Sequence, residues 1–305
     1  MYFVDEEEYY YYIERRKKEI EEVIKGKEFI SSQMKQIKDG LYACLTNDQI
    51  SIYADPKFDA DQMYQIREGL QQGFDVSVYA DPKFNSFQMA QIRYGFENNL
   101  TKKELDLYTN EKFNLFQMEQ IRYGLQNGLT IDQVKVYLNE KYDNNQMKQI
   151  RYGFENKLIK NQVKIYVNPK FDHYQMREIR YGLQNGLTED QVRTYADKIF
   201  DWQQMWQIRQ GLKEGLDVSI YSNEKYDSSQ MQEIRLGLEN GLTKEQIDLY
   251  AVPKYDDNQM YEIRKGLQNG LTIDQVKVYS NEKYDYKQMS EIRQRLELDL
   301  TNVME

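Results

Sequence analysis

Arginine is the residue whose spacing most readily indicates chemistry in this chain. It stands five residues after the glutamine of a Gln-Met pair in nine places: Arg67, Arg93, Arg122, Arg151, Arg180, Arg209, Arg235, Arg264 and Arg293. Stacked on successive helices, such a series could neutralise the phosphates of RNA or DNA. Alternatively, each arginine bonds helix-end carbonyls or an acidic neighbour between repeats. We favour this second interpretation because the net charge is −9.

Residues for catalysis or metal binding are few. The only histidine is His173 and the only cysteine is Cys44, which excludes an internal disulfide and a zinc site of the usual Cys/His type. The glycines follow the repeat and not a phosphate-binding pattern such as GxGxxG. Aspartates such as Asp59 and Asp143 stand where helices begin and are expected to cap them. We therefore predict that the protein is not an enzyme, with no catalytic residues, no cofactor and no metal.

Aromatic residues occupy positions where a solvent-facing helix normally carries polar side chains. These are the second, fifth and ninth residues of the first helix in consecutive repeats. The set, called the aromatic strip below, is Phe87, Tyr94, Phe116, Tyr123, Tyr152, Tyr174, Tyr181 and Trp206, with Trp202 nearby. If neighbouring helices cover this face, the aromatics are packing residues. If it is exposed, it is a candidate partner-binding surface, because Tyr and Trp are favoured at interface hot spots.

A repeat positions all these residues. The Gln-Met pair occurs ten times, from Gln33 to Gln288, at intervals of 29 or 26 residues, which is typical of stacked repeat proteins. In each repeat, capping residues predict an A helix of about 13 residues and a B helix of about 8. A glycine within the A helix costs about 1 kcal/mol, so its recurrence predicts close approach of a neighbouring helix. The fold class is therefore all-α, an α-solenoid of about ten helical hairpins.

The chain divides into three parts on this interpretation. Residues 1–28 form an N-terminal capping helix, residues 29–300 form the ten hairpins as one continuous solenoid, and residues 301–305 form a C-terminal tail. The array contains two blocks of five repeats. Residues 124–137 of the first block are identical to residues 266–279 of the second, so position 124 corresponds to position 266. In the second and seventh repeats the B helix is three residues shorter. We expect the stacking angle to change at these two places.

In architecture, residues 29–300 resemble helical-hairpin solenoids such as the tetratricopeptide and HEAT repeats, although the period and signature residues differ. No run is long and apolar enough for a membrane span, so a cytoplasmic protein with no membrane partner is expected. The leading functional hypothesis is a scaffold that binds a protein partner along the A-helix face. The alternatives are an acidic decoy or inhibitor of a nucleic-acid-binding protein, and an RNA- or DNA-binding solenoid.

Overall fold

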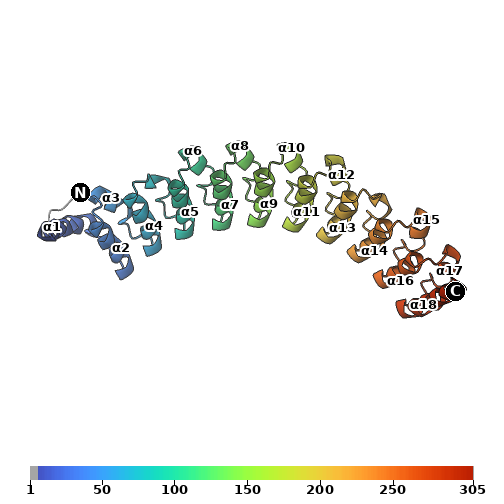
Figure 1. The fold of residues 1–305 in the computed structure, drawn as a ribbon. Helices are drawn as coiled ribbons and strands as arrows, with labels where there is room; N and C mark the ends of the chain where they lie inside the picture. The colour runs from blue at the N-terminus through green and yellow to red at the C-terminus, as the bar shows by residue number, and fades with distance from the viewer. Residues whose placement is uncertain (1–5, 305) are drawn as a thin grey trace. The chain divides into compact units, whose positions relative to one another are not determined.

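The computed structural model describes residues 6–304, and these residues are 61% helical without a strand. The predicted all-α fold of tandem helical hairpins with an N-terminal capping helix is thus confirmed. The chain forms two compact units, Met1–Arg151 and Tyr152–Glu305. In each unit the long A helices contact one another in chain order, and the short B segments line the other edge (Figure 1).

The first unit begins with the capping helix α1 (Glu6–Ile24). Its A helices are α2 (Ser31–Tyr42), α4 (Ala60–Gln71), α5 (Ser86–Glu97) and α7 (Leu115–Gln126). Its B segments are α3 (Asn47–Tyr53), the 3₁₀ turn η1 (Val76–Val78), α6 (Lys102–Leu105) and α8 (Ile131–Val134). Helix α9 (Asn144–Glu155) contains the boundary between the units.

The second unit repeats this arrangement. Its complete A helices are α11 (His173–Gln184), α13 (Trp202–Lys213), α14 (Ser228–Glu239), α16 (Asp257–Gln268) and α18 (Tyr286–Met304). Its B segments are α10 (Lys160–Val163), α12 (Glu189–Arg193), the 3₁₀ turn η2 (Val218–Ile220), α15 (Lys244–Ile247) and α17 (Ile273–Lys277).

The B segments are shorter than predicted. Most contain only four or five α-helical residues instead of about eight. The backbone then tightens, as where the amides of Leu107 and Tyr108 donate to carbonyls three residues earlier, Glu104 and Leu105, at 3.2 and 3.1 Å. This 3₁₀-type turn directs the tyrosine side chain back onto the A helix, where Tyr108 is fully buried. In the two short repeats only the 3₁₀ turns η1 and η2 remain.

One glutamine both begins its own A helix and holds the next repeat. The Oε1 of Gln117 accepts from the backbone N–H of Asn114 at 3.0 Å, while the Asn114 side chain accepts from the N–H of Gln117. The Nε2 of Gln117 donates to the carbonyl of Tyr142, in the following repeat, at 2.7 Å. Gln62 makes the same bond across a short repeat to Phe84 at 2.6 Å. These buried bonds fix the position of each repeat on its neighbour.

The glycine within each A helix accommodates a tyrosine hydroxyl. A Cβ on Gly182 would overlap the hydroxyl of Tyr195, which closes the B segment of the same repeat and is completely buried. That hydroxyl donates to the carbonyl of Glu178 at 3.3 Å. The close approach predicted from the sequence therefore comes from one tyrosine of the repeat's own B segment.

The two ends of the array are built differently. At the N-terminus, α1 buries Ile13 and Ile20, and Arg16 donates to the carbonyl of Leu45 at 2.6 Å. At the C-terminus, Arg295 and Asp299 replace the two glycines of the repeat. Without them α18 continues to Met304 and so includes residues 301–304 of the segment predicted as a C-terminal tail.

Candidate functional site: the A-helix face

The repeated arginines are buried between neighbouring A helices. Arg93, Arg122 and Arg264 are each only 7% exposed. The Nε of Arg93 donates to Gln65 of the preceding repeat at 2.9 Å, and the Nε of Arg264 donates to Glu233 at 2.8 Å. The acidic or amide neighbour between repeats is thus the observed partner. In the described part of the chain these guanidinium groups do not form an exposed basic surface.

Tyrosines of the aromatic strip pack on these arginines. In the first unit the guanidinium carbon of Arg122 lies 4.6 Å from the ring centre of Tyr123, on the same helix, and 5.6 Å from that of Tyr94, on the preceding one. Arg93 lies 4.9 Å from the ring of Tyr94. Cation–π contacts of this kind are worth about 0.5–2 kcal/mol. The inner face of each ring therefore belongs to the repeat packing, while the outer face is open.

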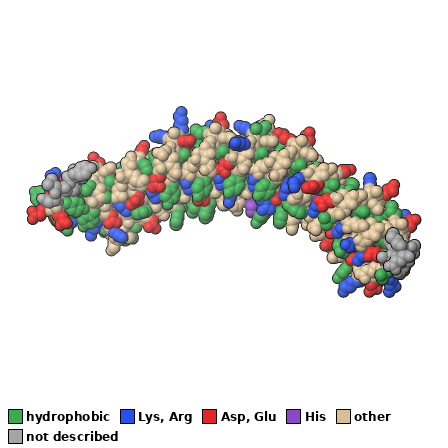
Figure 2. All heavy atoms as spheres, viewed as in Figure 1, with side chains coloured by type: hydrophobic (Ala, Val, Ile, Leu, Met, Phe, Trp, Pro, Cys, Tyr) green, Lys and Arg blue, Asp and Glu red, His purple; other side chains and the backbone are tan. Residues whose placement is uncertain are grey.

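The strip in the first unit is exposed. Phe87 and Phe116, the second residues of α5 and α7, have 65% and 53% of their surface accessible, and Tyr94 and Tyr123 have 38% and 37%. Figure 2 shows hydrophobic side chains along the edge of the molecule that the A helices form. An exposed row of large apolar side chains is typical of an interaction surface.

In the second unit the strip forms a cluster with a cation. The rings of Tyr174 and Trp202 are 5.7 Å apart, and the guanidinium carbon of Arg177 lies 5.2 Å from the first and 5.6 Å from the second. Tyr174 and Tyr181 are 43% and 38% exposed. Tyr, Trp and Arg are the residues most enriched at interface hot spots.

The remaining members of the strip are half-buried. Trp202 and Trp206 line a hollow of about 280 Å³ between α13 and α14, together with Ser228 and Gln232. Trp206 also lies 5.5 Å from the guanidinium carbon of Arg235, and the ring of Tyr152 lies 5.6 Å from that of Arg180. These three residues thus contribute to packing as well as to the surface.

The residues considered for catalysis have structural surroundings. The ring of His173 packs on Tyr174 with centroids 4.0 Å apart. Cys44 has φ +60°, in the left-handed conformation that glycines such as Gly128 adopt where the other A helices end. Within residues 6–304, no group of three His, Cys, Asp or Glu side chains is placed to hold a metal ion. In the same range no helix is long and apolar enough to cross a membrane.

Buried titratable groups serve the packing. Burial raises the pKa of the tyrosines that close the B segments, such as Tyr195 and Tyr250, well above the ordinary value. Burial also raises the pKa of Glu233, although its bond to Arg264 opposes that shift. Each of these groups contacts the repeat core, and none lies on the aromatic strip.

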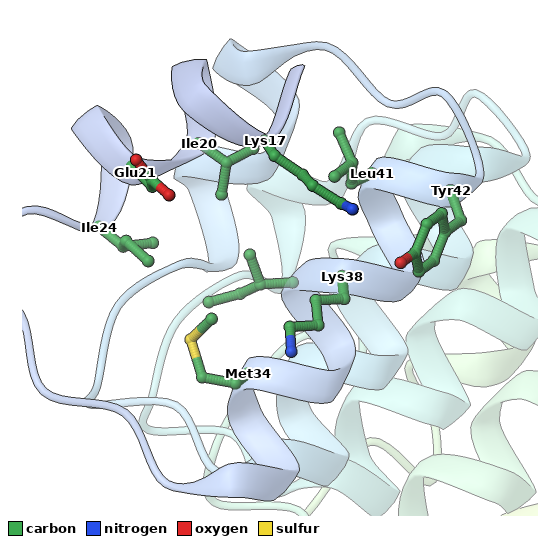
Figure 3. A pocket seen from close by; sticks show the side chains of 9 residues that line it. Lys17, Ile20, Glu21, Ile24, Met34, Lys38, Leu41 and Tyr42 are labelled. Carbon is green, nitrogen blue, oxygen red and sulfur yellow. The ribbon is translucent and has the colours of Figure 1, made fainter. Parts of the chain in front are cut away.

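A groove separates the capping helix from the first repeat. It encloses about 390 Å³ between α1 and α2, and Ile20, Ile24 and Met34 line its apolar part (Figure 3). Lys17 and Lys38 lie at its rim. Met34 is only partly buried, whereas the equivalent Met63 and Met89 are fully buried by the repeat before them. The groove therefore marks where α1 covers α2 less completely than another hairpin does.

Comparisons of this chain with protein-family models, curated proteins and solved structures find no match.

Two features of this face were missed from the sequence. Arg177 and Tyr64 (39% exposed) belong to it, because Tyr64 stacks on Arg67 at 5.3 Å and Arg177 joins two aromatic rings. Both stand at the fifth position of an A helix, but Tyr64 precedes the repeats of the aromatic strip and Arg177 is not aromatic. The second feature is the partner of one arginine, because Arg122 bonds Gln91 whereas its counterpart in the other block, Arg264, bonds Glu233. A comparison of equivalent positions in the two blocks would have revealed that change.

Proposed function

We propose that this chain is a non-enzymatic scaffold that binds a protein partner along its A-helix face. The observation that carries the proposal is the exposure of aromatic side chains there, above all the cluster of Tyr174, Arg177 and Trp202. Large aromatic residues exposed together are costly to leave in water and are favoured at the centres of interfaces.

The internal duplication separates residues needed for the fold from those of the strip. Gln, Arg, Gly and Tyr of the repeat recur at equivalent positions of the two blocks, except at Lys38 and Arg295. Most of the aromatic strip does not recur. The other block has non-aromatic residues at the positions equivalent to Phe87, Tyr94, Phe116, Tyr123, Tyr152, Tyr174, Tyr181 and Trp202. In the same order, these residues are Ser229, Leu236, Asn258, Lys265, Gln294, Ser32, Asp39 and Ala60. The same repeat therefore folds without aromatic residues at these positions. This supports binding as the reason for their presence.

The duplication also supplies the test. The variant carrying Tyr174→Ser and Trp202→Ala receives the residues found at the equivalent positions Ser32 and Ala60. Its matched control carries Ser32→Ala and Ala60→Ser. Each purified protein is used to capture partners from the cells that make it, and the affinity of any captured protein is then measured with purified components.

We expect the control to bind its protein partner as the wild type does and the strip variant to bind at least tenfold more weakly, since hot-spot truncations cost about 2 kcal/mol or more each. Circular dichroism and thermal unfolding must show that both variants remain folded. Equal affinity of the strip variant and the control would contradict the proposal. So would capture of nucleic acid in place of protein.

A further inference from the structure

Arg122 differs from most of the repeated arginines in having only neutral hydrogen-bond partners. Its Nε donates to Gln91 at 3.0 Å and its Nη1 donates to Gln126 at 2.9 Å, and both acceptors are amide oxygens. A carboxylate pairs with each of six equivalents: Arg67, Arg93, Arg209, Arg235, Arg264 and Arg293. Arg122 is 7% exposed, so it is a largely buried cation without a neutralising charge in direct contact.

One end of this guanidinium remains available. Among the contacts of the described residues, Nη2 of Arg122 has no hydrogen-bond partner. It is also not one of the fully buried unpartnered atoms in residues 6–304, so it is not completely shielded from water. The exposed rings of Tyr94 and Tyr123 flank the group at 5.6 and 4.6 Å. The nearby carboxylate of Glu119 accepts from the hydroxyl of Tyr123 at 3.0 Å.

In the other block, the charge of the equivalent arginine is neutralised by a carboxylate. Arg264, the counterpart of Arg122, donates to Glu233 at 2.8 Å, and Glu233 takes the place of Gln91. There Leu236 and Lys265 replace the two tyrosines. The repeat therefore accepts a carboxylate at this position without loss of its packing. In the first block, an uncompensated cation and two exposed aromatic rings occur together instead.

We propose that Arg122 binds a carboxylate of an Asp or Glu side chain in a linear segment of the protein partner, between the rings of Tyr94 and Tyr123. This inference rests on the proposed function. A partly desolvated guanidinium with free N–H groups is a strong donor to a carboxylate. The exposed ring of Phe116 offers apolar contact beside it. Glu119 and the net charge of −9 oppose the denser charge of a phosphate group.

The test neutralises the cation without removing it. Gln91→Glu introduces the residue that the other block carries at this place, and Glu233→Gln is the matched control. Peptides are selected from a displayed library of random linear sequences on the full-length wild-type chain. The affinities of the enriched peptides are then measured for the wild type and both variants. Thermal unfolding confirms that the variants are folded.

We expect the enriched peptides to share an acidic residue, to bind Gln91→Glu at least tenfold more weakly, and to bind Glu233→Gln unchanged. Replacing the acidic residue of the peptide by its amide must weaken binding to the wild type but add little loss in Gln91→Glu. Absence of enriched peptides, enriched peptides without an acidic residue, or equal binding to Gln91→Glu would overturn the inference.

A third pair of variants separates this inference from the proposed function. Peptides that lose affinity for Phe116→Asn and Tyr123→Lys, but not for Gln91→Glu, would leave the aromatic face as a binding surface and remove the role of Arg122. Peptides that bind all variants equally would contradict both.

Discussion

Alkaline pH should unfold this protein through its buried tyrosines. Eight of them, one in each of eight repeats, are fully buried and have a pKa raised by burial: Tyr53, Tyr79, Tyr108, Tyr166, Tyr195, Tyr221, Tyr250 and Tyr279. The folded chain holds these protons, while the unfolded chain releases them above pH of about 10. Their stabilising contribution is therefore complete below that pH and is lost as pH rises.

The magnitude follows from the number of groups. Each raised pKa lowers the free energy of unfolding by about 1.4 kcal/mol per pH unit above pH of about 10. Eight such groups lower it by about 11 kcal/mol per pH unit, compared with a total stability of about 5–15 kcal/mol for typical proteins. We expect cooperative unfolding between pH of about 10.5 and 11.5.

The assay follows tyrosinate absorbance and helical circular dichroism over the same pH range. The buried tyrosines should ionise together with the loss of helix. Tyr195→Phe should reduce the pH dependence of the unfolding free energy by about one eighth, and Tyr10→Phe, at an exposed position, is the matched control. If all 27 tyrosines ionise in one step while the helical signal persists, the reasoning is wrong.

Three further predictions concern the packing between and within repeats. Gly182→Ala should lower the free energy of unfolding by about 2–3 kcal/mol in urea titration, because its Cβ meets the Tyr195 hydroxyl, and adding Tyr195→Phe should restore part of that loss. Gln117→Ala should cost about 2–3 kcal/mol in the same assay, because both the helix cap and the bond to Tyr142 disappear; a cost below about 0.5 kcal/mol would contradict this. Burial raises the pKa of Glu233, so as pH falls this carboxylate gains its proton in the folded chain before it does so in the unfolded chain. The free energy of unfolding of the wild type, relative to that of Glu233→Gln, should therefore rise from neutral pH to pH of about 4.5. A fall over this range would contradict the assignment.

The helical hairpins could be predicted because each signal is local. The cap formed by Asn114 and Gln117 lies within four residues, and the structure contains it as expected. The length of the B helix could not be derived in this way. The last turn has 3₁₀ geometry and brings the Tyr108 hydroxyl to the carbonyl of Gln91 on the A helix, a tertiary contact between residues 17 positions apart.

The candidate site was only partly accessible from the sequence. Angular positions along the A helix identified Phe87 and Phe116 as outward-facing, and both are more than half exposed. The same argument placed Tyr123 and Trp206 outward, but it could not show that their inner faces pack on arginines of the same or the next repeat. The contact between Trp206 and Arg235 joins residues 29 positions apart, beyond the reach of helical periodicity.

Position-specific photo-crosslinking tests the binding surface most directly. A photoreactive amino acid replaces Phe116, and the matched protein carries it at Asn258, the equivalent position of the second block. Both proteins are irradiated in the cells that produce the chain. The aromatic-face account predicts one protein partner crosslinked at position 116 and little or none at position 258. Equal crosslinking at the two positions, or crosslinking at position 258 alone, would contradict it.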